Sequence, residues 1–145
     1  MKLINLFLLL LLSISVFGQN ATKAGELIIE PPTLICLGFD WRISGDENIN
    51  ATVDVQYRKE GEAEWKNYLP LLRTGRGRTA DYGFGNFNDP NHEMRYRIPD
   101  GFAGSIMDLE PNTVYEVRLE MKDPDGVSGD HVRELKLKTR DEPQL

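Results

Sequence analysis

Segment 73–87 combines glycine, arginine and aromatic residues, which are residue types that bind phosphates, nucleic acids or sugars. Within it, Gly75–Ala80 matches the G-x-G-x-x-A pattern of dinucleotide-binding loops. That pattern works only between a strand and a helix, because the pyrophosphate meets backbone N–H groups at the helix N-terminus. No helical hydrophobic period follows Ala80. We therefore interpret the match as coincidental and expect no bound cofactor.

The same segment carries three arginines and three aromatic residues: Arg73, Arg76, Arg78, Tyr82, Phe84 and Phe87. A net charge of -6 argues against nucleic acid as the partner, because an acidic surface repels phosphates. One interpretation is glycan binding, with Tyr82, Phe84 and Phe87 stacking on sugar rings. The other is packing of the loop or contact with a neighbouring domain, since aromatic side chains more often bury apolar area than bind a ligand.

The acidic and histidine residues form no recognisable metal or catalytic pattern. Asp123, Asp125 and Asp130 surround a turn, but the third ligand and the glycine of an EF-hand loop are missing. His92 and His131, the only histidines, lie far apart in the sequence, which is not a zinc spacing. There is also no G-x-S-x-G motif. We expect no catalytic residue and no metal, and therefore no enzyme.

Stretch Ile106–Gly126 predicts a tyrosine corner, a half-buried strand and a tight turn, in that order along the chain. Apolar residues alternate with charged ones from Tyr115 to Met121, which is the period of a half-buried strand. The preceding Leu109-x-Pro111-x-Thr113-x-Tyr115 indicates a tyrosine corner, in which the Tyr115 hydroxyl bonds to nearby backbone. The following Asp123-Pro-Asp-Gly126 is typical of a tight turn into another strand.

Alternation, short apolar runs and turn signals predict the other strands. The expected strands lie in Glu26–Glu30, Thr33–Ile43, Ala51–Lys59, Trp65–Tyr68 and His131–Thr139. Ile35, Leu37, Phe39, Trp41 and Ile43 share one face, with Trp41 at the centre of the core, and Val53, Val55 and Tyr57 share another. Six or seven short strands with turn signals between them favour an all-β sandwich.

In order and spacing, these elements resemble a fibronectin type III domain, an immunoglobulin-like β-sandwich of about seven strands. The resemblance uses Pro31-Pro32, Trp41, the Val53-x-Val55-x-Tyr57-Arg58 strand, Trp65 and the Leu109–Tyr115 corner, and it covers most of 27–139. It gives structural roles to Trp41, Tyr57, Leu109, Pro111 and Tyr115. The chain departs from the family at 69–102, where an inserted loop is expected. The resemblance is strongest to N-terminal modules of secreted bacterial parallel β-helix proteins of the polysaccharide-lyase type.

Both ends of the chain carry further signals. Met1-Lys2 precedes an apolar run, Leu3–Phe17, that reads as a secretory signal peptide ending at Gly18 and is too short for a comfortable membrane span. Without residues 1–18, the 145-residue chain keeps 127 residues, and its net charge falls from -6 to -7 because Lys2 is lost. The expected organisation is an extension at 19–25, one domain at 26–140, and a linker or truncated end at 141–145.

Cys36 is the only cysteine, so the domain has no intrachain disulfide. A small apolar filler, a reactive thiol and a bridge between two copies all remain open as its role. A disulfide-free exported domain favours a bacterial periplasm, cell surface or exterior.

Together these observations predict a non-catalytic, secreted interaction or positioning module, the N-terminal part of a larger exported protein. Its expected partner is a neighbouring domain or protein. The alternative is a carbohydrate-binding module that uses the aromatic 69–102 loop and is attached to a polysaccharide-degrading enzyme.

Overall fold

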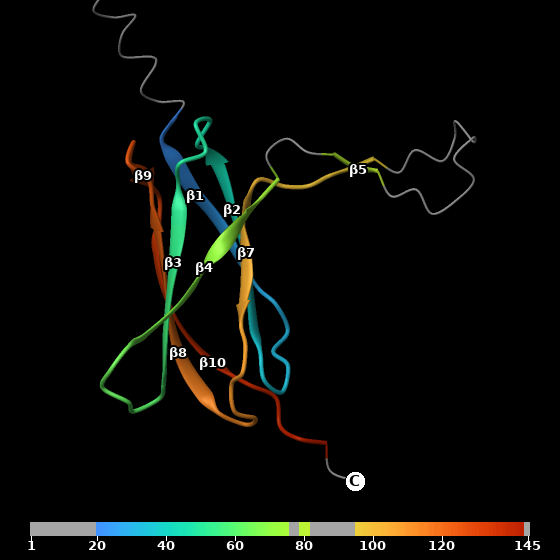
Figure 1. The fold of residues 1–145 in the computed structure, drawn as a ribbon, viewed down its shortest axis with the longest axis vertical. Helices are drawn as coiled ribbons and strands as arrows, with labels where there is room; N and C mark the ends of the chain where they lie inside the picture. Colours follow the sequence, from blue (N-terminus) through green and yellow to red (C-terminus); the bar gives the residue numbers. More distant parts are fainter. Residues whose placement is uncertain (1–19, 76–78, 82–94, 144–145) are drawn as a thin grey trace, which may run out of the picture.

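The computed structural model describes residues 20–75, 79–81 and 95–143, and it is an all-β sandwich (Figure 1). Ten strands follow one another along the described parts of the chain: β1 (Thr22–Ile29), β2 (Leu37–Gly45), β3 (Thr52–Lys59), β4 (Lys66–Thr74), β5 (Thr79–Asp81), β6 (Arg95–Arg97), β7 (Gly101–Ile106), β8 (Val114–Lys122), β9 (Val127–Ser128) and β10 (Val132–Lys138). Strands β5 and β6 form a separate two-stranded ribbon that projects from the sandwich (Figure 1).

The other eight strands are hydrogen-bonded in the order β10-β8-β3-β4-β7-β2-β1-β9. One layer holds β10, β8 and β3, the other holds β7, β2, β1 and β9, and β4 belongs to both. The first part of β4 pairs with β3 as far as Leu71, and its last part pairs with β7 from Leu72 onward. The two layers are therefore joined by a hydrogen-bonded strand along one side only.

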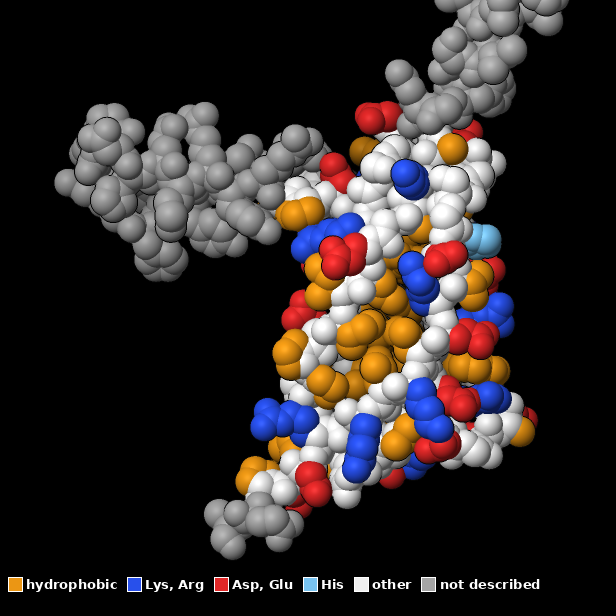
Figure 2. Space-filling model, turned by 180° about the vertical axis from the view of Figure 1, so that it is seen from behind, with side chains coloured by type: hydrophobic (Ala, Val, Ile, Leu, Met, Phe, Trp, Pro, Cys, Tyr) orange, Lys and Arg blue, Asp and Glu red, His pale blue; other side chains and the backbone are white. Residues whose placement is uncertain are grey.

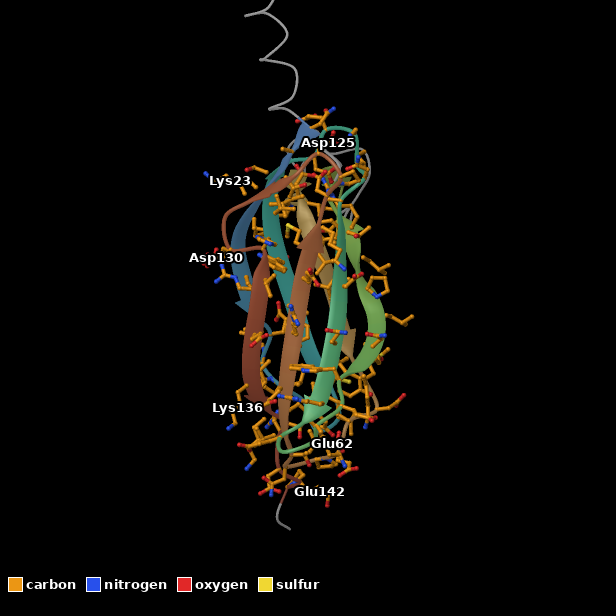
Figure 3. The ribbon with its side chains drawn as sticks, turned by 90° about the vertical axis from the view of Figure 1, so that its left-hand side faces the viewer. Lys23, Glu62, Asp125, Asp130, Lys136 and Glu142 are labelled. Atoms are coloured by element: carbon orange, nitrogen blue, oxygen red, sulfur yellow. The ribbon has the colours of Figure 1, made fainter. Side chains whose placement is uncertain are left out.

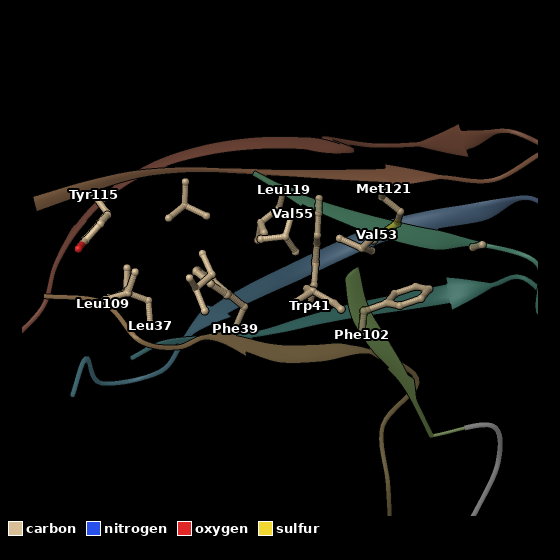
Figure 4. Close-up of a cluster of buried hydrophobic side chains, with 14 residues drawn as sticks. Leu37, Phe39, Trp41, Val53, Val55, Phe102, Leu109, Tyr115, Leu119 and Met121 are labelled. Carbon is tan, nitrogen blue, oxygen red and sulfur yellow. The ribbon is translucent and has the colours of Figure 1, made fainter. Parts of the chain in front are cut away.

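The core lies between the layers and consists of the alternate residues of the long strands (Figure 4). Trp41 is completely buried, and its indole Nε1 donates a hydrogen bond of 3.3 Å to the Gly25 carbonyl. Around it lie the other buried apolar side chains, which include Leu37, Phe39, Val53, Val55, Phe102, Ile106, Leu109, Tyr115, Val117, Leu119 and Met121. The alternation seen in the sequence thus separates core from surface on β2, β3 and β8.

The core is less well covered at the side of the sandwich opposite β4. This edge lies between β1 and β10, which pack against the core with the partly buried side chains Leu27, Ile29, Leu135 and Leu137. Figure 2, viewed from the side opposite Figure 1, shows hydrophobic side chains in a hollow in the middle of the molecule. Short parallel pairing of β1 with β9, at Thr22 and Lys23, closes only one end of this edge.

Two strand starts differ clearly from the sequence predictions. Strand β1 begins at Thr22 rather than Glu26, so most of the expected 19–25 extension belongs to the sheet. The start of β1 carries no apolar pattern that would predict a strand. Its buried residue Thr22 is polar, and the Thr22 Oγ1 donates a 2.5 Å hydrogen bond to Asp123. Strand β2 begins only at Leu37, and Ile35 is 46% exposed instead of in the core. The Thr33 hydroxyl accepts hydrogen bonds from the Ile35 and Cys36 backbone N–H groups, and this turn points Ile35 outward.

The expected 69–102 insertion is shorter at both ends. Residues Leu69–Thr74 continue β4, and β7 already begins at Gly101. Leu69 and Leu72 gave no strand signal because their side chains are 71% and 74% exposed. Pro70, which cannot donate to a ladder, stands where the β3–β4 register shifts, a position that proline tolerates. The expected six or seven strands become eight in the described sandwich, because β7 and the short β9 join the six ranges named from the sequence.

Candidate functional site

The residues first considered for chemistry do not come together in the described structure. Tyr82, Phe84 and Phe87, the candidate glycan-stacking residues, lie outside the described residues, and the carbohydrate-binding alternative therefore stays a prediction. In the G-x-G-x-x-A match, Gly75 directly follows β4 with a positive φ of 84°, and Thr79 begins the β5–β6 ribbon. A strand thus follows where a dinucleotide loop would need a helix.

The three turn aspartates have separate partners. Asp123 accepts from the Thr22 hydroxyl, and Asp130 forms an ion pair of 3.3 Å with Arg133. Asp125 accepts hydrogen bonds from Asn48 (2.7 Å) and Asn50 (3.0 Å), which lower its carboxyl pKa. Figure 3 shows Asp125 and Asp130 at clearly different positions on the molecule. Within the described residues, no three acidic, histidine or cysteine side chains are grouped to hold a metal ion.

His131 and Cys36 each lie beside a local turn. The His131 ring nitrogen Nδ1 lies 3.4 Å from the Gly129 carbonyl, at an exposed position. Cys36 is half-buried with a free thiol, and its backbone N–H donates to Thr33. His92 lies outside the described residues.

A shallow polar depression lies on the outer face of β3, β4 and β8. It is lined by Asp54, Val55, Gln56, Asn67, Tyr68, Arg118, Glu120 and Lys122. Its polar groups bond one another: Lys122 pairs with Asp54 at 2.8 Å, and Gln56 donates to Asn67 at 2.9 Å. These internal pairs make the depression a weak candidate for a ligand site.

Apart from Trp41 in the core, the residues expected to have structural roles lie around the loop between β7 and β8. Leu109 is buried, and Tyr115 accepts a 2.9 Å hydrogen bond from the Glu110 backbone N–H onto its hydroxyl. The Tyr57 ring lies between Tyr68 and Tyr115, with ring centroids 5.7 and 6.2 Å away. Pro111, half-buried, lies in the same turn. This aromatic group fixes the loop between β7 and β8.

The end of β10 is fastened to the same loop. The buried Thr139 hydroxyl donates to the Glu110 carbonyl at 2.6 Å and accepts from the Thr113 backbone N–H at 3.0 Å. One residue later, the Arg140 backbone N–H donates to the Thr33 carbonyl at 2.9 Å. The chain therefore leaves the sandwich from a fixed point between two loops. We call loops 31–36 and 107–113 together with 139–141 the C-terminal pole.

Exposed apolar side chains accompany this fixed exit. Leu34, Ile35 and Met107 are 37%, 46% and 50% exposed. Their loops are rigid, because the Leu109 backbone N–H donates to the Ile35 carbonyl and that of Met107 to the Tyr68 hydroxyl. Figure 3 places Glu142, just beyond the exit, at the opposite end of the molecule from Asp125. The C-terminal pole thus combines rigidity, an apolar surface and a chain exit, and it is the best candidate for a functional surface.

One buried ion pair near the other end was not predicted from the sequence. The Asp46 side chain is fully buried and pairs with Arg73 of β4, whose side chain is 10% exposed. Asp46 Oδ1 also accepts from the backbone N–H groups of Asn50 (2.9 Å) and Ala51 (3.3 Å). The Arg73 guanidinium lies 5.2 Å from the centre of the Phe102 ring. The pair holds the β2–β3 loop against β4 and is structural.

Comparison with known proteins identifies no family for this chain. No protein-family model matches the chain, and no curated protein matches it. A solved structure from the computer-based redesign of a β-sandwich protein is similar at 12% identity, with a TM-score of 0.44. The match covers 82% of this chain and 95% of that one. Within the described ranges, the structure contains no helix that could span a bilayer.

Proposed function

We propose that this chain is a secreted, non-catalytic interaction module of the fibronectin type III kind, and that it positions a neighbouring domain of a larger exported protein. The C-terminal pole carries the proposal. A flexible tether would need no fixed exit, whereas here Thr139 and Arg140 are hydrogen-bonded to both adjacent loops. Three exposed apolar side chains beside that exit supply a surface for the neighbour.

The strand layout supports the fibronectin type III assignment. Strands β1, β2 and β7 lie in one layer and β3, β8 and β10 in the other, with β4 shared, and this two-layer sandwich is what the resemblance implies. The Tyr115 hydroxyl bond occurs at the predicted corner. The proposed secretion rests on the Leu3–Phe17 run of the expected signal peptide, which lies outside the described residues.

The first test is the mass of the native product, detected with an antibody against residues 19–145. The proposal expects a mass well above that of this segment. A product that matches the segment alone would refute the positioning role.

A second test addresses the docking surface in the native product. Replacing Ile35 and Met107 by serine should remove apolar contact and increase protease cleavage at 141–145. Ile49→Ser is the matched control, because Ile49 is 45% exposed and lies in the loop beside Asp125, at the other end of the sandwich. Equal cleavage in wild type, control and double variant would show that no domain docks on the pole.

A further inference from the structure

Strand β10 offers an unpaired backbone edge. It ends the hydrogen-bonded order, and none of the described strands lies on its other side. The Met121 N–H donates to the His131 carbonyl, and the Thr139 N–H donates to the Thr113 carbonyl, at 2.8 and 3.1 Å. Backbone groups of alternate residues face the same neighbour in an antiparallel ladder, so odd-numbered residues of β10 bond β8. The even-numbered residues direct their N–H and C=O groups to the free side: Val132, Glu134, Lys136 and Lys138.

Apolar surface lies directly beside this edge. Leu135 and Leu137 face the core side of β10 and are only partly buried, as are Leu27 and Ile29 of β1 across the gap. They belong to the less covered edge described above. An unpaired strand next to apolar surface is a template for another strand.

The β10 sequence is complementary to itself in charge. If two copies pair antiparallel about a two-fold axis at Leu135, each Glu134 lies opposite Lys136 of the other copy. Opposite charges directly across a strand pair stabilise it, and like charges destabilise it. Moving the axis by one residue to either side places Glu134 opposite Glu134, or Lys136 opposite Lys136. Only the axis at Leu135, among these three, satisfies the charges, and it also brings the two Leu135 side chains together.

We propose that two copies of this chain associate through their β10 strands, antiparallel, with Leu135 on the two-fold axis. The two β4-β3-β8-β10 layers then form one continuous sheet. This interface uses a different surface from the C-terminal pole and does not depend on the proposed function. The pairs that Glu134 and Lys136 make within one copy, with Arg118 and Glu60, are exposed, so both side chains remain free to turn toward a second copy.

Arg133 is the one charged side chain on the inner side of β10. It forms an exposed-edge ion pair with Asp130 and is 34% exposed. In the proposed register it lies opposite Leu137 of the second copy, where its methylene groups can cover the leucine while the guanidinium stays in water. A single strand pair buries less surface than a standard interface, so we expect a dissociation constant of about 10 µM to 1 mM.

A charge-swap experiment tests the partner and the register together. The full chain is expressed and purified in the form that remains after any processing in the cell. Its self-association is measured by sedimentation equilibrium up to about 1 mM. Wild type should dimerise. Glu134→Lys and Lys136→Glu should each dimerise about tenfold more weakly or worse, because each places like charges opposite at two positions. An equimolar mixture of the two variants restores both opposite-charge pairs and should form heterodimers, identified by native mass spectrometry.

Three results would each overturn the proposal: a monomeric wild type at about 1 mM, single variants that dimerise like wild type, or folded variants that fail to pair when mixed. Thermal unfolding of each variant shows whether it is folded. If either charge variant does not fold, Lys136→Pro replaces it. The Lys136 N–H points to the free side, so proline there leaves the β8 ladder intact and should abolish dimerisation, as proline does at an edge strand.

Discussion

Removing one partner of the buried Asp46–Arg73 pair should cost more stability than removing one partner of an exposed pair in the described structure, and Asp46→Asn tests this directly. Asparagine keeps an oxygen that can accept from the Asn50 and Ala51 backbone N–H groups. It also tolerates the left-handed conformation of Asp46, whose φ is 55°. The substitution therefore removes the charge and replaces the Oδ2 acceptor of Arg73 by an amide NH2 donor. Arg73, with a side chain only 10% exposed, would then lack its carboxylate.

Breaking a buried ion pair by removing one partner costs about 3–5 kcal/mol. We expect about 3 kcal/mol for Asp46→Asn, the lower end of that range, because Arg73 keeps slight exposure and its place over Phe102. Arg73→Met leaves the fully buried carboxylate alone and should cost about 4 kcal/mol. Removing both partners should cost less than the sum, because neither charge is then left buried without the other.

Urea unfolding followed by tryptophan fluorescence measures these costs, since Trp41 is fully buried. The matched control is Lys122→Ala, which removes an ion pair with Asp54 whose two side chains are each 52% exposed. Exposed pairs contribute about 0–1 kcal/mol. The reasoning is refuted if Asp46→Asn costs no more than this control, or if the double variant costs the full sum of the single ones.

Three further predictions concern turns. Tyr115→Phe should cost about 1–2 kcal/mol in urea unfolding, because the Glu110 backbone N–H loses its acceptor; an unchanged midpoint would exclude a role for this bond. Gly45→Ala should lower the thermal midpoint more than Gly61→Ala. Both glycines have positive φ, but an added Cβ at Gly45 meets the Ala21 carbonyl, whereas space is open at Gly61, so equal midpoints would contradict the packing argument. Hydrogen bonds from Asn48 and Asn50 lower the Asp125 pKa below its ordinary 3.8. The folded form therefore gains stability from Asp125 above that pH and loses it as pH falls through the lowered pKa. The difference in midpoint between wild type and Asp125→Asn should shrink below about pH 3.8, and a constant difference would contradict this linkage.

Local alternation predicted the parts of the fold that bury one side of a strand. Strands β3 and β8 follow the period of two closely, and Trp41 lies in the core as that pattern requires. The β-sandwich class followed from these strands and their turns. The turn at Asp123–Gly126 was also readable, since the Gly126 backbone N–H donates to the Asp123 carbonyl and Gly126 has a φ of 103°.

What could not be predicted depends on contacts between distant residues. The first half of β1 has a polar sequence and is held by pairing with β2 and β9. The later half of β4 exposes its leucines and changes neighbours at a proline, so it lacks a strand pattern. Asp46 and Arg73 are 27 positions apart, and nothing in either neighbourhood marks the other. The C-terminal pole likewise needs loops from three parts of the chain.

The change of neighbours within β4 has a mechanical consequence. On that side, separating the two layers means breaking backbone hydrogen bonds to β3 or β7, whereas between β1 and most of β10 only side-chain contacts resist. Thermal fluctuations should therefore separate the two layers at the β1–β10 edge first, while β4 keeps them joined on the opposite side. Water would reach the core first past Leu27 and Leu135, and a second copy bound to β10 would restrain that same motion.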